Sequence, residues 1–512
     1  MKLNRTLRGS TATTNYEGAK AYKMNDKSRL YTRTASCFFG EPKFYGNQDN
    51  ELIKDAHAVA KKDPEFVLKL AAYARNKLNL RTVSIVLLTE ASLINECKPF
   101  VREYTPLIVK RADELAEAVA YLEHKVGDLG DQRDEGSMPS ALKRGLADAF
   151  HNFDEYQLAK YDRDNAKVKL RDVMRLTHPK PKDEAQSALF KKVVDRSLET
   201  PSTWETIVSG KGSTPEAWKK AMRVMPYMAT LRNLRNLLKQ GFDITGALNR
   251  ISDPENVRKS KQLPFRFFSA YRQIEGMDSN AQASETLDAL EEAMDVSVEN
   301  LPKLPGTTAI FIDSSGSMTS SLSSRSSLSY ADAAIMLGVI AHRVCEKSLV
   351  YMFDSELRSV NLSKRSGVLS NVRKLSDMVH GGATYGHLCF EELIKKNKVV
   401  DRIILLSDMQ CYTDGMWGSE IAPAYREYKK QVAPECQLYS VDLSGYGTLQ
   451  VPEQNTALIA GFSEKFLNFV KLWETEGVSA VEAIGSKAKC ASCELKDTCK
   501  KPRALAKEVK KK

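Results

Sequence analysis

The sequence lacks the features that would assign it to a membrane or secretory class. No run of eighteen or more apolar residues occurs in its 512 residues, so no transmembrane helix is expected. Met1 leads into a polar stretch that has no apolar signal-peptide core. Nine cysteines are scattered rather than arranged as a dense disulfide framework, which is typical of a reducing environment. These absences favour a cytoplasmic protein that makes no use of a membrane.

Catalytic signatures are also missing. The chain contains no Walker-type phosphate loop, no zinc-protease motif and no Gly-x-Ser-x-Gly nucleophile elbow. His380 and His387 flank a glycine-rich loop, but packing or loop hydrogen bonding explains them better than a role as a catalytic base. We therefore predict that the chain is not an enzyme, and we assign no catalytic residue.

Charge and length divide the chain into three predicted parts. The chain is too long for one ordinary domain, and its formal net charge is +11. Residues 1–300 carry 48 Lys and Arg against 42 Asp and Glu, residues 301–484 carry 18 against 20, and residues 485–512 carry 10 against 3. A basic first half and a basic, cysteine-containing tail thus flank a near-neutral domain. This distribution favours a polyanion partner, and the alternative is a merely solvated surface.

Residues 1–300 show recurring helical periodicity without a convincing strand. The stretch Val83–Ala91 is almost wholly apolar and should be buried between neighbouring helices. Short breaks marked by Pro, Gly or Ser suggest helix pairs of the HEAT kind, and the alternative is an irregular helical domain. We expect helices near residues 52–60, 64–74, 83–91, 108–123, 138–151, 185–198, 215–224, 227–239 and 282–295.

One part of this helical half concentrates cations beside an aromatic ring. Between residues 158 and 181, Tyr161 is accompanied by basic side chains that suit RNA phosphates and exposed bases. The alternative is that nearby acidic residues, among them Asp154, Glu155, Asp162 and Asp164, neutralise these cations. The basic residues include Lys160, Arg163, Lys167, Lys169, Arg171, Arg175, His178 and Lys180.

Residues 301–484 alternate between strand and helix patterns. Strands are expected up to Ile312 and at 349–353, 402–406 and 437–441, and a helix is expected from about residue 330 to Val344. Such alternation is typical of a doubly wound, mainly parallel sheet covered by helices on both faces. Ligands of such sheets collect at the carboxyl ends of the strands.

Oxygen-bearing side chains occur at two of these strand ends and in one loop. Asp313, Ser315 and Ser317 follow the first strand at alternate positions, Thr384 follows two glycines, and Asp408 follows a second buried strand. Carboxylate and hydroxyl oxygens suit a hard divalent cation, most simply Mg²⁺. The alternative is that these polar residues only cap helices and turns.

The tail contains three cysteines whose spacing allows several interpretations. Cys490, Cys493 and Cys499 could hold zinc or an iron–sulfur cluster, but both normally need a fourth ligand. The alternatives are reactive or disulfide-forming thiols, or no site.

Several phrases in the first half carry a family resemblance through their order and spacing. With the metal-site pattern, they make the chain resemble the Ro autoantigen family, in which a TROVE module precedes a von Willebrand factor A-type domain. The resemblance implies a closed ring of HEAT-like repeats whose basic outer surface binds small structured noncoding RNAs (Y RNAs). It also implies a central hole that accepts the single-stranded 3′ ends of misfolded RNAs. The phrases are Met138–Arg144, Lys160–Arg163, Arg171–Pro181, Thr203–Glu205, Leu231–Asn236 and Leu263–Phe267.

The resemblance also suggests roles for individual residues. Lys160 and His178 fall on family positions associated with RNA binding, whereas Arg163 is offset by one residue from the expected basic position. By the same resemblance, Lys143 and Arg144 would belong to the same basic surface. Arg175 lies within one of the resembling phrases and completes the set of RNA-binding candidates.

In A-type domains the corresponding oxygen ligands form a metal-ion-dependent adhesion site. By resemblance, Ser315, Ser317 and Thr384 would contact the ion, and Asp313 and Asp408 would supply charge, partly through water. The open position would take a carboxylate from a partner protein, for example an exoribonuclease. The leading hypothesis is a noncoding-RNA-binding ribonucleoprotein component, and its rival is a metal-dependent adhesion or scaffolding module without an RNA ligand.

Overall fold

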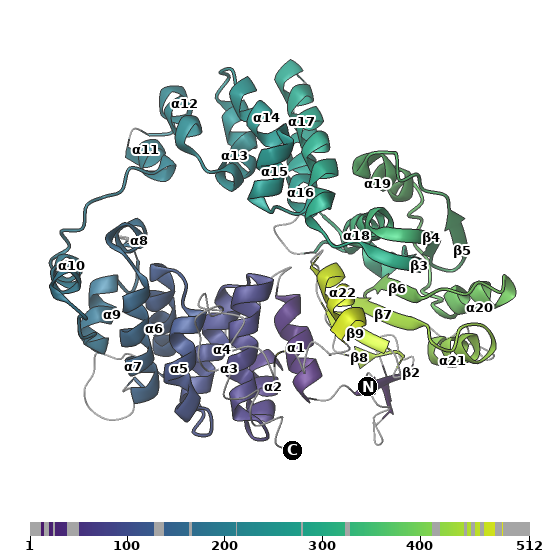
Figure 1. The fold of residues 1–512 in the computed structure, drawn as a ribbon, viewed down its shortest axis with the longest axis horizontal. Helices are drawn as coiled ribbons and strands as arrows, with labels where there is room; N and C mark the ends of the chain where they lie inside the picture. The colour runs from purple at the N-terminus through teal and green to yellow at the C-terminus, as the bar shows by residue number, and fades with distance from the viewer. Residues whose placement is uncertain are drawn as a thin grey trace. The chain divides into compact units, whose positions relative to one another are not determined.

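The structure is a computed structural model of the whole chain (Figure 1). It describes residues 12–14, 20–23, 26–37, 51–126, 138–162, 166–210, 212–277, 280–322, 328–411, 420–444, 448–451, 456–460, 465–476 and 484. The chain divides into two compact units, and neither of them ends at residue 300. One unit comprises Met1–Gly40 and Pro201–Ser479, and the other comprises Glu41–Thr200 and Ala480–Lys512.

The unit that contains residues 41–200 is helical throughout its described part. Asp63 caps the helix that starts at Pro64 by accepting the Phe66 amide, as expected for an Asp-Pro start. The apolar stretch Val83–Ala91 is buried, as predicted. The helices are α2 (Glu51–Ala60), α3 (Pro64–Tyr73), a π-helical turn (Ala74–Leu78), α4 (Thr82–Leu93), α5 (Lys98–Ile108), α6 (Ala112–Val126), α7 (Ser140–Ala149), a 3₁₀ turn (Phe150–Asn152), α8 (Glu155–Tyr161), α9 (Leu170–Thr177) and α10 (Glu184–Asp195).

The other unit begins with two short strands that the sequence analysis did not predict. β1 (Ala12–Thr14) and β2 (Lys20–Lys23) pair with each other, and β2 pairs with β8 (Thr448–Leu449) from the far end of the chain. The expectation that residues 1–300 contain no strand is therefore wrong. Strands of three or four residues show no measurable alternation, and their partner β8 is distant in sequence.

Helices follow in this unit before its large sheet begins. They are α1 (Asp26–Ser36), α11 (Trp204–Gly210), α12 (Pro215–Val224), α13 (Tyr227–Lys239), α14 (Thr245–Ser252), α15 (Pro254–Ser260), α16 (Pro264–Glu275), α17 (Ala281–Ser297) and a 3₁₀ turn (Val298–Asn300). The hydrophobic core that contains Trp218 of α12 continues through α16 and α17 into the sheet domain as far as Val470. Arg272 of α16 forms an ion pair with Asp332, 2.8 Å away, and strengthens this junction.

The large sheet has six strands in the order β5-β4-β3-β6-β7-β9, and only the edge strand β5 is antiparallel. The chain starts in the middle at β3, moves outward to one edge, and returns to the other side of β3. The carboxyl ends of β3 and β6 therefore flank the position where the strand order reverses. The strands are β3 (Leu304–Asp313), β4 (Cys345–Phe353), β5 (Leu357–Val360), β6 (Arg402–Ser407), β7 (Gln437–Asp442) and β9 (Thr456–Ala460).

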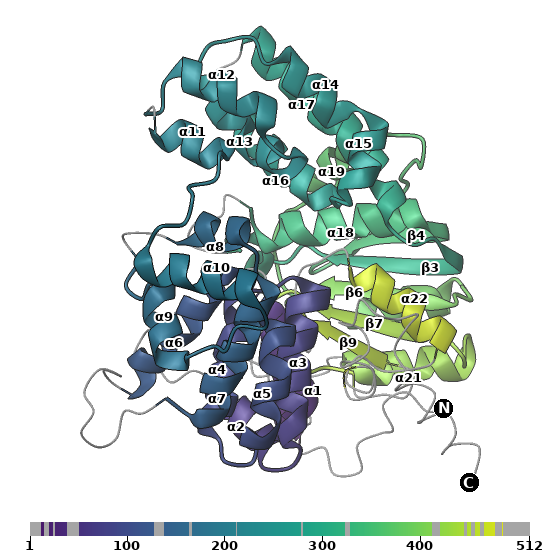
Figure 2. The same cartoon turned by 60° about the vertical axis from the view of Figure 1, so that its left-hand side comes forward.

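Helices cover both faces of this sheet, which confirms the predicted α/β class (Figures 1 and 2). Ile310 and Ile312 of β3 pack with helices on one face, and Ala309 and Phe311 pack with helices on the other. This alternation follows from the pleat of the strand. The first face carries α18 (Tyr330–Val344), α19 (Val368–Ser376) and α22 (Phe466–Glu476), and the second carries α20 (His387–Lys395) and α21 (Ile421–Gln431).

None of the helices in the described part of the chain is long and apolar enough to cross a membrane.

Candidate nucleic-acid interface and candidate metal centre

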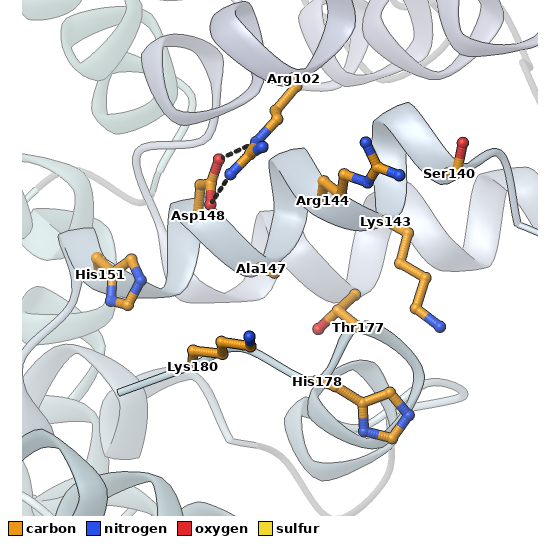
Figure 3. Close-up of a pocket in the computed structure, with 10 residues that line it drawn as sticks. All are labelled: Arg102, Ser140, Lys143, Arg144, Ala147, Asp148, His151, Thr177, His178 and Lys180. Carbon is orange, nitrogen blue, oxygen red and sulfur yellow. Dashed lines mark hydrogen bonds and ion pairs between the residues drawn. The ribbon is translucent and has the colours of Figure 1, made fainter. Parts of the chain in front are cut away.

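A basic pocket of about 600 Å³ lies among α5, α7 and the end of α9 (Figure 3). It contains three of the predicted RNA-binding residues, Lys143, Arg144 and His178. Figure 3 shows the Lys143 side chain extending from α7 toward Thr177 at the end of α9. The full lining consists of Arg102, Ser140, Lys143, Arg144, Ala147, Asp148, His151, Thr177, His178 and Lys180.

A glycine sets the distance between the two helices that form one wall. A Cβ atom added to Gly145 of α7 would lie 2.4 Å from Thr105 Oγ1 and 3.3 Å from the Arg102 Cα of α5. Any side chain at this position would force the helices apart, because real Cβ atoms do not approach other atoms so closely. Because Gly145 has no side chain, α5 can pack closely against α7, and this packing brings Arg102 of α5 near Lys143 and Arg144 of α7.

His178 marks the point where α9 ends. Its backbone is left-handed, with φ 49° and ψ 59°, and its amide donates to the Met174 carbonyl at 2.9 Å. The following Pro179 disfavours a helical conformation at residue 178, and histidine tolerates the left-handed region better than most residues. The result is an exposed imidazole at the edge of the pocket.

The pocket has an excess of positive charge. Asp148 is the one acidic residue among the described residues that line it, and Arg102 binds it with Nε at 2.7 Å and Nη2 at 3.2 Å. This carboxylate raises the pKa of Arg102. Lys143, Arg144 and Lys180 form no ion pair with any residue that the structure describes. Three lysine and arginine side chains are therefore available to an anion.

The remaining RNA-binding candidates do not line this pocket. The Lys160 ammonium lies 5.9 Å from the Tyr156 ring centre and 5.8 Å from that of Tyr161, at the outer limit of a cation–π contact with each ring. The Arg111 guanidinium lies closer to the Tyr161 ring, at 4.4 Å from its centre. Arg175 is exposed on α9. Arg163 lies outside the described residues.

Two of the four acidic neighbours, Asp154 and Glu155, have partners other than Lys160. Asp154 caps α8 by accepting the Gln157 amide at 2.7 Å, and Glu155 pairs with Lys192 at 2.8 Å. Elsewhere in the stretch, Lys167 lies 3.7 Å from Glu123 and Arg171 lies 3.6 Å from Asp172, so these two cations are paired with carboxylates. Among the described residues, the cationic interpretation therefore applies to Lys160 and the alternative applies to Lys167 and Arg171.

Sequence reasoning missed two residues of the pocket. Arg102 lies 46 residues before its partner Asp148, and His151 lies in a 3₁₀ turn beyond α7. Neither belongs to the basic run at 158–181. No local pattern marks them, because α5 and α7 come together only in the folded chain.

The five predicted metal ligands lie on the elements expected of them. Asp313 ends β3, Ser315 and Ser317 lie in the turn after it, and Asp408 directly follows β6. The Gly316 amide donates to the Gly382 carbonyl at 3.0 Å, which attaches the loop that carries Thr384. Both loops therefore meet where the strand order of the sheet reverses.

Hydrogen bonds orient the Asp313 carboxylate within this group. Its Oδ1 accepts the Ser315 amide at 2.9 Å, and its Oδ2 accepts the Ser407 hydroxyl at 2.6 Å. The hydroxyl oxygens of Ser315 and Ser317 lie 3.3 Å apart. The site thus presents carboxylate and hydroxyl oxygens close together, which is the chemistry that a hard cation requires.

Electrostatics also fit a cation. Asp313 is fully buried, and Thr384 and Asp408 are 1% and 3% exposed. Burial, and after it the charge of Asp408, raises the pKa of Asp313 to about 7. Two buried carboxylates that repel each other are stabilised by a positive ion between them.

The described residues contain no cluster of three or more His, Cys, Asp or Glu side chains suited to a metal. Any metal at Asp313 and Asp408 therefore depends on hydroxyl oxygens. Cys490, Cys493 and Cys499 lie outside the described residues, so the zinc or iron–sulfur hypothesis stays a prediction.

Known proteins resemble this chain in sequence and in fold. It is 25% identical over 308 residues to telomerase protein component 1 of Rattus norvegicus, which covers 44% of this chain and 12% of the rat protein. It is 23% identical over 364 residues to the RNA-binding protein RO60 of Deinococcus radiodurans, which covers 60% of this chain and 66% of that protein. The chain therefore spans only a small part of the telomerase component.

A solved structure extends the likeness to the fold. The crystal structure of the Deinococcus radiodurans RO (RSR) protein matches with a TM-score of 0.64 at 18% identity, and covers 89% of this chain and 100% of that one.

Family models locate both domains. The TROVE domain model matches residues 12–200 and 196–287, and the Ro60 vWA domain model matches residues 308–472. Since the TROVE matches alone cover more than half of the sequence, the chain belongs to the TROVE-domain family and has the domain combination of Ro proteins.

Proposed function

We propose that this chain binds RNA and that the pocket of Lys143, Arg144 and His178 contacts RNA phosphates. The observation that carries the proposal is the group of cations without ion-pair partners among the described residues, gathered in one pocket. Cations that have no acidic partner retain their full charge for phosphate. The name of the Deinococcus relative, an RNA-binding protein, supports the same class of ligand.

The ligands we propose are small structured noncoding RNAs, including Y RNA-like molecules, and the single-stranded 3′ ends of misfolded RNAs. Membership of the TROVE family supports this choice. Lys160 beside the exposed ring of Tyr156 offers a cation and an aromatic face for unpaired nucleotides. The role would be RNA scaffolding or quality control in the cytoplasm.

The oxygen cluster in the sheet domain is proposed to hold Mg²⁺. Asp313, Ser315, Ser317, Thr384 and Asp408 supply oxygens of the type that Mg²⁺ prefers. The bound ion would supply a positive charge for a partner protein's carboxylate, for example that of an exoribonuclease. The residues of this chain orient the ligands: Ser407 fixes one Asp313 oxygen, and the Gly316–Gly382 hydrogen bond fixes the two loops.

A direct test compares two double variants that remove the same charge. Lys143→Gln/Arg144→Gln removes unpaired cations from the pocket. Lys54→Gln/Lys192→Gln removes lysines that already pair with Glu51 and Glu155. Affinity for a labelled RNA hairpin with a single-stranded 3′ tail is measured between about 50 and 200 mM salt.

The pocket variant is expected to bind RNA more weakly. The logarithm of its association constant should also fall less steeply with the logarithm of the salt concentration, by about 1.4 to 1.8 in slope, because each lost phosphate contact contributes about 0.7 to 0.9. The control is expected to keep the wild-type slope. Equal slopes for all three proteins would contradict the assignment, as would an unchanged affinity of the variant Lys160→Ala/His178→Ala.

The oxygen cluster also supports a second candidate function, a metal-dependent adhesion module without RNA. The ratio of absorbance at 260 nm to that at 280 nm, measured on protein purified at low salt, separates the two. Co-purifying nucleic acid supports RNA binding, and its absence supports the adhesion module.

A further inference from the structure

The helices α12 and α13 carry a second concentration of positive charge, which lies in the other compact unit from the pocket. Residues 215–239 contain six Lys and Arg and one acidic residue, Glu216. All six cations are exposed, and none forms an ion pair with a residue that the structure describes. They are Lys219, Lys220, Arg223, Arg232, Arg235 and Lys239.

The cations of α13 lie on one face of the helix. Leu231, Leu234 and Leu237 turn into the core, whereas Arg232, Arg235 and Lys239 are exposed at spacings of three and four residues. At a rise of 1.5 Å per residue the three side chains span about 10 Å along the helix axis. A row of cations on this scale can follow several successive charges of a nucleic-acid strand.

Other cations of the same unit are neutralised by partners. Arg258 pairs with Glu299 at 2.7 Å, and Lys259 pairs with Glu255 at 2.9 Å. Asp243, between α13 and α14, is an acidic residue close to this surface. Its carboxylate already accepts hydrogen bonds from the Thr245 hydroxyl and amide, and of the six cations it interacts electrostatically only with Lys219. Among the described residues, ion-pair partners are therefore missing for the cations of α12 and α13 but present for those two cations of α15 in the same unit.

This arrangement is unfavourable for the helices themselves. Arg235 and Lys239 are four residues apart, and so are Lys219 and Arg223, which places like charges side by side on each helix. Local choices that destabilise an element without an evident structural gain are expected at functional surfaces. A bound polyanion would relieve the repulsion.

We infer that α12 and α13 form a second RNA-binding surface, on which Arg232 and Arg235 contact phosphates. The inference rests on the proposed RNA-binding function and extends it from one site to two. RNA is favoured over an acidic protein because arginines aligned along one helix can each engage a phosphate of a continuous strand. An RNA that reaches both surfaces binds with the gain of a bivalent ligand.

The test uses the double variant Arg232→Gln/Arg235→Gln in the full chain. Its control, Arg258→Gln/Lys259→Gln, removes the same charge from paired cations of α15 in the same unit. Binding of a labelled single-stranded RNA is measured over a salt series, and melting temperature is measured in parallel. A charge-preserving variant, Arg232→Lys/Arg235→Lys, shows whether the fold tolerates substitution there.

We expect Arg232→Gln/Arg235→Gln to lower the salt slope by about 1.4, since two single-strand phosphate contacts are lost. Its melting temperature should equal or exceed that of the wild type, because like-charge repulsion is relieved. The lysine variant and the α15 control should keep the wild-type slope. Combining the α13 and pocket substitutions should lower the slope further than either pair alone.

Three outcomes would overturn the inference. If Arg232→Gln/Arg235→Gln keeps the wild-type slope while Lys143→Gln/Arg144→Gln lowers it, RNA binds at the pocket only and the proposed function stands. If the α13 variant and the α15 control lower the slope equally, net charge alone is responsible. Loss of binding to an acidic protein, with RNA binding intact, would likewise assign the surface to a protein partner.

Discussion

Replacing Gly145 with alanine tests whether the contact between α5 and α7 positions the basic pocket. The added Cβ would lie 2.4 Å from Thr105 Oγ1 and 2.7 Å from Thr105 Cβ. Overpacking of this kind costs about 1 to 3 kcal/mol, and the higher helix propensity of alanine returns about 1 kcal/mol. The substitution should therefore destabilise the helical unit by up to about 2 kcal/mol. It should also weaken RNA binding, because Lys143 and Arg144 move with α7.

Hydrogen exchange of the α5 and α7 amides is the appropriate assay, since a chain of two compact units need not unfold in one step. Gly246→Ala serves as a matched control in α14, where an added Cβ meets no atom within 4 Å. It should be neutral or stabilising by up to about 1 kcal/mol. If Gly145→Ala exchanged as slowly as the wild type and bound RNA equally well, the packing argument would be refuted.

Three further predictions concern the sheet domain. Burial lowers the pKa of His342 to about 4 from an ordinary value of 6.5. The neutral form of His342 should therefore contribute about 3 kcal/mol to the free energy of unfolding above pH 6.5, and this contribution is lost as the pH falls through 4. In the variant His342→Asn, the free energy of unfolding should fall less steeply over this acidic range. Mg²⁺ at a hundredfold excess over its Kd should stabilise the protein by about 2.7 kcal/mol, and Asp408→Asn should abolish the resulting rise in melting temperature. Glu474→Leu should destabilise the protein by about 3 to 5 kcal/mol in urea titrations, because Arg402, which is 3% exposed, would lose its bidentate partner.

The sheet domain was predictable because its strands are strongly apolar and its helices amphipathic or buried. The pattern that ends at Ile312 continues into Asp313, and the structure places β3 there as the central strand that is paired on both sides. A central parallel strand is buried on both faces, so its sequence is continuously apolar and easily recognised. The helix expected to end at Val344 is also found, as α18.

Short and polar elements of the helical part were less accessible to prediction. α9 has eight residues, and α5 contains Pro106 and begins beside Pro99, so neither shows a long uninterrupted period. The pairing of β2 with β8 joins residues more than four hundred positions apart. Such elements depend on tertiary contacts rather than on local preference.

The candidate sites show the same division. The positions of the predicted oxygen ligands could be expected from the sequence, because each follows a recognisable strand or glycine pair and strand ends meet at one edge of a parallel sheet. The pocket was predictable only in part. Lys143, Arg144 and His178 came from the family resemblance, whereas Arg102 is brought to them by the packing of α5 against Gly145.

Photocrosslinking of RNA that co-purifies with the chain, followed by identification of both the RNA and the crosslinked peptides, tests RNA binding most directly. Proteolysis and mass spectrometry would locate the crosslinks on the sequence. We predict noncoding RNA crosslinked to peptides from α7 and residues 177–180, with a second group from α12 and α13. A chain that retains no RNA at low salt, or crosslinks found only outside these segments, would contradict the proposed function.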